Sequence, residues 1–89
     1  MKKTGVYILE CSNGRYYIGS TCDLNRRLDE HNNGSVRSTR RILPISLKFF
    51  HPCTDLRYAR RIEYKLKRKK SRQILKKIIS DGHIEFLGS

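Results

Sequence analysis

The fold of this chain is decided by residues 5–19, which read GVYILECSNGRYYIG. Two β-prone runs, residues 4–9 and 15–19, flank the dipeptide Asn13-Gly14. Asn-Gly between two such runs is the strongest short-range signal for a β-hairpin. We therefore predict two antiparallel strands joined by a tight turn.

Two of the three tyrosines of this hairpin, Tyr7 and Tyr17, are predicted to share a face. Side chains alternate between the faces of a strand, so Val6 and Ile8 share one face and Tyr7 lies on the other. The same alternation separates Ile18 from Tyr17 on the return strand. With a simple register, Tyr7 and Tyr17 project from the same face of the hairpin.

The rest of the chain predicts one further strand and three helices. A helix is expected to begin near residues 20–23, where S-x-x-D loosely matches a capping box, and to end at the Asn-Asn-Gly of residues 32–34. A basic loop or short helix then leads into a strand over residues 45–51. Two more helices are expected, from residue 54 or 55 to 69 and from Ser71 to residue 81, with a short strand in residues 83–89. This order predicts an α+β fold, in which a small three-stranded antiparallel sheet is flanked by helices, as a single domain over residues 1–89.

The charge of the chain indicates its partners. Twenty Lys and Arg residues against eight Asp and Glu residues give a net charge of +12 over 89 residues. Such a charge favours polyanions, with nucleic acid first and an anionic membrane surface second. No run approaches the ~18–20 apolar residues that a membrane span needs. The start of the chain does not resemble a secretory signal, and three cysteines without a CxxC pair favour a reducing compartment, so we expect a cytoplasmic protein.

Three polar residues fall where apolar ones are expected. Arg27 and His31 share a helical stripe with two leucines, and Glu63 lies within the apolar arc of a later helix. Each has a structural explanation, because an arginine stem can lie on a core, a core histidine can be hydrogen-bonded, and Glu63 can pair with a cation such as Lys67. These residues alone indicate a basic nucleic-acid-binding domain and do not establish catalysis.

The paired motifs Gly5-Val6-Tyr7 and Tyr17-Ile18-Gly19 resemble those of the GIY-YIG nucleases, with Val6 in place of the usual isoleucine. That family expects an arginine eight residues after the last motif glycine, where Arg27 lies, and a histidine one turn later, where His31 lies. It also expects a glutamate on a later helix, which Glu63 matches. The resemblance covers residues 4–75 and is closest to the stand-alone, single-domain branch of the family. The chain departs from the family pattern at one position. Many members carry an asparagine about a dozen residues after the glutamate, but residues 71–75 contain no asparagine, and Gln73 is the nearest equivalent.

The resemblance implies an endonuclease that hydrolyses phosphodiester bonds in DNA with the help of one divalent ion. Glu63 would be the protein ligand of Mg²⁺ or Mn²⁺, held firmly only together with substrate, because a single carboxylate binds such ions weakly. Arg27 would grip a phosphate oxygen, and His31 would orient or deprotonate water. Tyr7 would contact the water, as the base or through His31, and Tyr17 would hydrogen-bond the phosphate or the water.

The tyrosines also carry an expectation about charge. A free phenol has a pKa near 10 and is protonated at pH 7. We expect Arg27 and the ion to lower the pKa of Tyr7. The resemblance further implies that Gly5 and Gly19 keep the backbone free of side chains near the DNA.

The remaining cations are expected to contact phosphates. No element is long enough to read many bases, so sequence specificity should be low or local, and structure-directed or single-strand-directed cleavage stays open. The alternative is a non-catalytic basic nucleic-acid-binding module with the same fold. A protein partner or a homodimer is compatible with these residues, which support neither. The expected phosphate contacts are Arg26, Arg37, Arg40, Arg41, Lys48, Lys65, Lys67, Arg68, Lys69 and Lys70.

Overall fold

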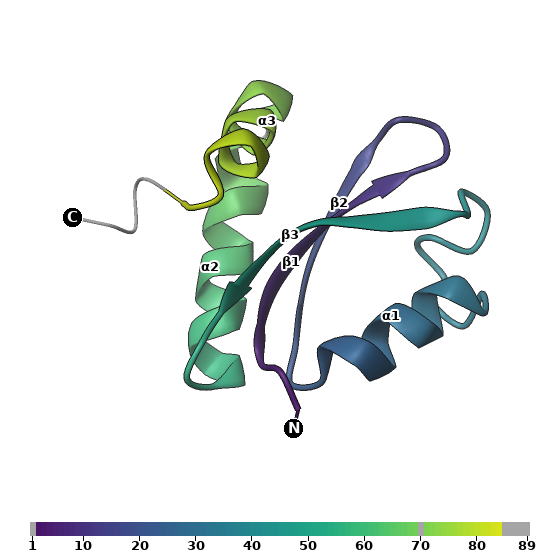
Figure 1. The fold of residues 1–89 in the computed structure, drawn as a ribbon, viewed down its shortest axis with the longest axis horizontal. Coiled ribbons are helices and arrows are strands. Elements are labelled where there is room, and N and C mark those ends of the chain that lie inside the picture. The colour runs from purple at the N-terminus through teal and green to yellow at the C-terminus, as the bar shows by residue number, and fades with distance from the viewer. Residues whose placement is uncertain (1, 70, 85–89) are drawn as a thin grey trace.

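The computed structural model describes residues 2–69 and 71–84. This part of the chain forms three strands and three helices (Figure 1). Their bounds are β1 Gly5–Cys11, β2 Tyr16–Thr21, α1 Leu24–Asn32, β3 Ile45–Pro52, α2 Leu56–Lys69 and α3 Arg72–Asp81. The predicted α+β fold, with a three-stranded antiparallel sheet flanked by helices, is confirmed. None of the described helices is long and apolar enough to cross a membrane.

The first strand of the predicted hairpin is the centre of the sheet. Strand β1 pairs with β2 on one side and β3 on the other, both antiparallel, so β2 is an edge strand. Gly14 occupies the turn with φ +82°, a left-handed conformation that glycine adopts without steric cost. Its N–H donates to the Cys11 carbonyl at 2.9 Å and closes the turn.

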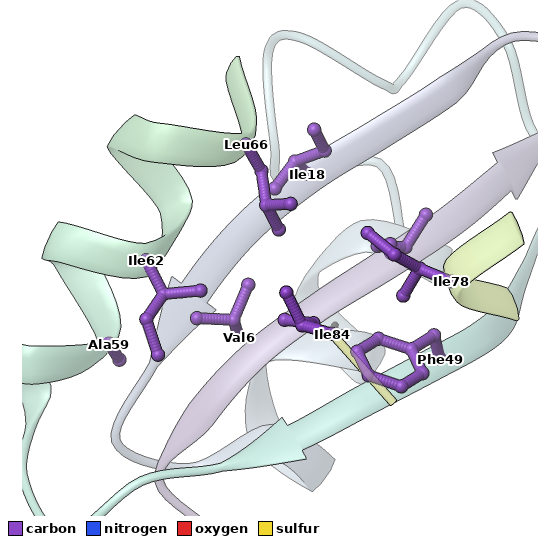
Figure 2. Close-up of a cluster of buried hydrophobic side chains, with 9 residues drawn as sticks. Val6, Ile18, Phe49, Ala59, Ile62, Leu66, Ile78 and Ile84 are labelled. Carbon is purple, nitrogen blue, oxygen red and sulfur yellow. The ribbon is translucent and has the colours of Figure 1, made fainter. Parts of the chain in front are cut away.

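Helices α2 and α3 cover one face of the sheet and α1 lies on the other (Figure 1). The α2/α3 face buries the apolar residues predicted to share it, and Figure 2 shows the side chains interleaved between strands and helices. This core consists of Val6, Ile8, Ile18, Phe49, Ala59, Ile62, Leu66, Ile78 and Ile84. On the α1 face, Tyr7 and Leu9 pack against Leu24. The predicted alternation of the hairpin is therefore confirmed.

The end of β2 differs from that expected, whereas α1 begins within the expected residues 20–23. Strand β2 extends to Thr21, so Ser20 is a strand residue and does not cap α1. The cap is Asp23, whose side chain accepts from the N–H of Arg26 at 3.2 Å. The basic segment before β3 forms turns rather than a helix, and it buries Val36 and Thr39.

The expectations for the C-terminal part are met as far as the structure describes it. Ser71 caps α3, and Gly82 ends it with φ +78°. Of the strand expected in residues 83–89, the described residues His83 and Ile84 form no strand, and Ile84 packs into the core because it is apolar. Phe86 and Lys70 lie outside the described residues.

Candidate active site

The hydroxyl of Tyr7 is the centre of a buried polar cluster on the α1 face. Tyr7 is 1% exposed, and its Oη lies 3.0 Å from Nε2 of His31. Arg27 Nε donates to the same oxygen at 3.4 Å. Arg27 and His31 follow each other by one turn of α1, so one helix face brings both to the phenol. The structure thus assembles three of the predicted site residues around one oxygen atom.

His31 is held from both sides of its ring. It is fully buried, and its Nδ1 lies 2.7 Å from Oγ1 of Thr39, which is also fully buried. Burial, reinforced by the positive charge of Arg27, lowers the pKa of His31 from 6.5 to about 4. The imidazole is therefore neutral at pH 7, with one nitrogen as a donor and the other as an acceptor. When Nε2 accepts from the Tyr7 hydroxyl, Nδ1–H donates to Thr39.

Thr39 is a residue that the sequence did not single out. It lies in the basic segment between α1 and β3, where nothing in the pattern distinguishes it from its neighbours. Its role follows only from the chain path, which brings this segment against His31. Thr39 fixes the orientation of the imidazole.

The pKa of Tyr7 moves in the direction opposite to that expected. Its hydrogen bond with Arg27 lowers the pKa, as predicted, but burial of the phenol outweighs it and the pKa is raised from 10.0. A buried phenolate loses its hydration, which disfavours the charged form. Tyr7 is therefore a neutral phenol that can pass a proton on, rather than a preformed phenolate.

Tyr17 completes the aromatic part of the cluster. Its ring centroid lies 6.4 Å from that of Tyr7 and 5.2 Å from that of His31. The prediction that both tyrosines share one face is confirmed. Tyr17 is half-buried, so it lies between the buried centre and solvent.

Glycine at position 19 is required by the packing of this cluster. A Cβ atom at Gly19 would overlap the hydroxyl and ring of Tyr7, whose cross-strand partner it is. At Gly5, a Cβ would overlap the carbonyl oxygen of His51 in β3. Contacts within the protein itself thus account for both motif glycines.

Glu63 approaches β2, the edge strand, from the face of the sheet opposite to Tyr7. It lies on α2, and its Oε1 accepts a hydrogen bond from Oγ of Ser20, the residue after Gly19. Its Oε2 pairs with Nζ of Lys67 at 2.6 Å, one of the structural partners considered from helical spacing. Ser20 was missed as a site residue, although strand alternation places it on the face that α2 covers.

The donor set at Glu63 suits an ion that takes most of its ligands from water and phosphate. In residues 2–69 and 71–84 there is no group of three or more His, Cys, Asp or Glu side chains placed to hold a metal. The Glu63 side chain is 20% exposed, and its carboxylate already binds one cation, the Lys67 ammonium. Mg²⁺ typically binds through one or two carboxylates plus substrate phosphates. Because Lys67 is 53% exposed, it is free to swing aside for such an ion.

A model of the GIY-YIG catalytic domain matches residues 3–77 of this chain. The chain belongs to the GIY-YIG family. This is a nuclease family, and the resemblance of the paired motifs is confirmed.

Relatives of this GIY-YIG domain are small proteins named UPF0213. One from Streptococcus pneumoniae serotype 4 is 43% identical over 72 residues, which cover 80% of this chain and 73% of that protein. Another from Bacillus cereus is 37% identical over 75 residues, covering 80% and 78%. The solution NMR structure of a UPF0213 protein from Bacillus halodurans superimposes with a TM-score of 0.55 and 34% identity, over 88% of this chain and 83% of that one.

The predicted phosphate contacts that the structure describes are all exposed and, with one exception, fall into two groups along the chain. Four follow α1 or lie on it, and another four lie along the last turns of α2. Lys48 is the exception, because it lies on β3, the edge strand opposite β2, and pairs with Glu10 at 3.7 Å. The two groups are Arg26, Arg37, Arg40 and Arg41, and Lys65, Lys67, Arg68 and Lys69.

The lowered pKa of His31 predicts acid sensitivity of the fold. In the unfolded chain this imidazole takes up a proton below about pH 6.5, but in the folded protein only near pH 4. The stability that the neutral form provides is thus present above pH 6.5 and is lost as the pH falls to about 4. We expect a loss of about 3 kcal/mol over this interval from this group.

Urea unfolding at a series of pH values from 7 to 4 measures this effect. His31→Gln should flatten the pH dependence, whereas His83→Gln, at an exposed histidine, should leave it unchanged. Equal pH dependence in wild type and His31→Gln would contradict the assignment of a buried neutral imidazole.

Proposed function

We propose that this GIY-YIG domain is a divalent-metal-dependent endonuclease that hydrolyses phosphodiester bonds in DNA with low or local sequence specificity. The observation that carries the proposal is the position of the Tyr7 hydroxyl. It accepts from Arg27 and contacts His31 on the α1 face, and Gly19, the cross-strand partner of Tyr7, precedes Ser20, which donates to Glu63 on the opposite face. Groups suited to proton transfer, phosphate binding and metal binding are thereby brought next to residues 19 and 20 of β2.

The contacts of Tyr7 support a role as the group that takes the proton of the attacking water. As Oη accepts that proton, its own proton passes to Nε2 of His31, 3.0 Å away. The low pKa of His31 keeps the imidazole in its neutral, accepting form at pH 7. Thr39 then accepts from Nδ1–H and keeps the ring in line.

Arg27 is suited to hold the phosphate beside Tyr7. Its guanidinium carries five N–H donors, and the structure engages Nε with Tyr7 and one Nη1 donor with Glu30 at 3.1 Å. Donors remain for a phosphate oxygen, which a guanidinium binds in a bidentate manner. Tyr17, at the solvent side of the cluster, is placed to hydrogen-bond the phosphate or the water.

Glu63 is the residue that would hold the divalent ion, Mg²⁺ or Mn²⁺. When bound, the ion would stabilise negative charge on the phosphate and its leaving oxygen. Ser20 orients the Glu63 carboxylate for this task by donating to Oε1. Lys67 neutralises the carboxylate until substrate and ion arrive.

Two observations favour a second candidate, a non-catalytic nucleic-acid-binding module. The Glu63 carboxylate is occupied on both oxygens by the protein itself, through Ser20 and Lys67. In addition, Gln73, which stands nearest to the position of the asparagine of many family members, is exposed on α3. In this alternative, the basic surface binds nucleic acid and Glu63 serves only as an ion-pair partner.

A cleavage panel distinguishes the two candidates. Labelled duplex, single-stranded, flap and four-way-junction DNA, with single-stranded RNA beside them, would be incubated with Mg²⁺, with Mn²⁺ and with chelator. We expect cleavage of DNA that the chelator abolishes and that a Glu63→Gln protein, purified in parallel, does not show. Tight binding without cleavage of any substrate by folded wild-type protein would overturn the endonuclease and leave the binding module.

A further inference from the structure

A pocket of about 380 Å³ adjoins the candidate active site on the side of the β2 edge. It lies between the start of β2, the end of α2 and the start of α3. Its volume falls within the ~300–1,000 Å³ of ordinary small-ligand sites. Neither the family match nor the proposed reaction uses this pocket.

Two residues connect the pocket with the site. Tyr17 lines the pocket and packs against the rings of Tyr7 and His31. Lys67 lines it as well and pairs with Glu63. The aliphatic lining of the pocket belongs to the α2/α3 face, so the pocket meets the site around the β2 edge, and a nucleic-acid strand that crosses this edge would bring a nucleotide beside the pocket.

The interior of the pocket is lined mainly by aliphatic side chains and by planar groups. Ile18, Leu66 and Leu75 provide aliphatic surface. The ring of Tyr16 forms a wall together with the guanidinium of Arg72, which lies 4.8 Å from the ring centroid. Arg72 is fixed there because its Nη1 donates to the carbonyl of Gly14 at 2.6 Å, across the hairpin turn. Planar aromatic and guanidinium surfaces are those on which unpaired bases stack.

The charge around the pocket fits a nucleotide rather than a neutral ligand. Its rim carries Arg15, Lys67 and Arg72, all exposed, and no carboxylate occurs among the described residues that line it. A base on the apolar interior would leave its phosphates among these cations. A paired base is already stacked in its duplex and cannot enter.

We propose that this pocket takes one unpaired base of the substrate strand, next to the phosphate that is cleaved. The inference rests on the proposed function, since it assumes that the bound strand runs through the site at Tyr7 and Glu63. It narrows the substrate class to nucleic acid with an unpaired nucleotide at the cleavage position: a single strand, a flap or a frayed junction. The pocket holds the base by stacking and is indifferent to its identity.

Binding to two oligonucleotides of equal charge tests this proposal. A fluorescein-labelled oligothymidine and an oligomer of the same length whose bases are all replaced by tetrahydrofuran would be titrated with wild-type protein in chelator, by anisotropy. We expect the base-bearing strand to bind about 5- to 100-fold more tightly. The ratio of the two affinities removes the contribution of the phosphates.

Variants of Tyr16 and Arg72 test whether the pocket causes the tighter binding of the base-bearing strand. Tyr16→Ala and Arg72→Gln should both reduce the ratio toward one, and Tyr16→Phe should retain it. Tyr64→Ala is the matched control, because Tyr64 forms a similar pair with Arg68, at 5.6 Å, outside the pocket. Arg72 is exposed, so its variant keeps the test valid if Tyr16→Ala does not fold.

Two results would overturn the pocket assignment: equal binding of both oligomers by wild type, or a ratio that neither Tyr16→Ala nor Arg72→Gln reduces. The measurement needs no cleavage, so it is independent of the proposed reaction. Base-dependent binding through Tyr16 without any cleavage would contradict the proposed endonuclease activity and leave the pocket proposal intact. Cleavage without base-dependent binding would contradict the proposed base binding in the pocket and leave the endonuclease proposal intact.

Discussion

Glu63→Gln is expected to lower the rate of DNA cleavage by at least about 10³-fold, the size of the charge stabilisation that a bound ion contributes. The amide keeps the shape of the side chain and can still accept from Ser20, so the fold should persist. Removing the negative charge also frees Lys67 for phosphate. DNA affinity in chelator should therefore stay the same or increase. Single-turnover cleavage and anisotropy, with circular dichroism of both proteins, measure the three quantities.

Glu10→Gln is the matched control for this substitution. Glu10 also pairs with a lysine, Lys48 at 3.7 Å, but on the side of the sheet where β1 meets β3. Its replacement should leave cleavage unchanged. If Glu63→Gln cleaves as fast as wild type, Glu63 is only an ion-pair partner of Lys67 and holds no ion in the reaction.

Tyr7→Phe should reduce cleavage by about 10²- to 10⁴-fold, the range for loss of a positioned proton acceptor. The ring remains, so its packing against Tyr17 and Leu24 is preserved. The substitution removes the acceptor for Arg27 and the partner of His31, and leaves Nε2 of a buried ring unpaired. This should cost about 1–3 kcal/mol of unfolding free energy, which urea titration would detect.

The exposed residue Tyr64, which is 61% exposed, provides the control for the loss of a phenol hydroxyl. Tyr64→Phe should change neither cleavage nor stability. Unchanged cleavage by Tyr7→Phe would show that the hydroxyl neither takes nor passes a proton. The proposed route through His31 would then be wrong.

The sequence predicted the fold well because its local signals are strong. The Asn13-Gly14 turn fixes the hairpin register, and the alternation of Val6 and Tyr7 then fixes which side chains meet which helix. The start of α1 was predicted only to within residues 20–23, because Ser20 and Asp23 are both good capping residues. The extension of β2 to Thr21, set by pairing with Gly5, decides between them.

For the candidate site, the motifs and their spacing pointed to candidate residues but not to the burial and contacts of their side chains. Tyr7, Arg27, His31 and Glu63 follow from the resemblance of the motifs, and helical geometry explains why two of them meet. The raised pKa of Tyr7 depends on burial by tertiary packing, which no local pattern reports. Thr39 and Ser20 were missed for the same reason, since each is defined by a contact between distant segments.

The contact between Ser20 and Glu63 joins residues 43 positions apart, and that between Tyr7 and His31 joins residues 24 apart. Contacts of such long range must await loop closure, so they form late relative to local helices and turns. A nascent chain that has released only the hairpin and α1 carries five Lys and Arg residues against four Asp and Glu residues, so it is nearly neutral, and it lacks the carboxylate of α2. It has neither most of the basic residues expected to contact nucleic acid nor the residue proposed to hold the ion. The proposed cleavage is therefore expected only after synthesis and folding of the domain are complete.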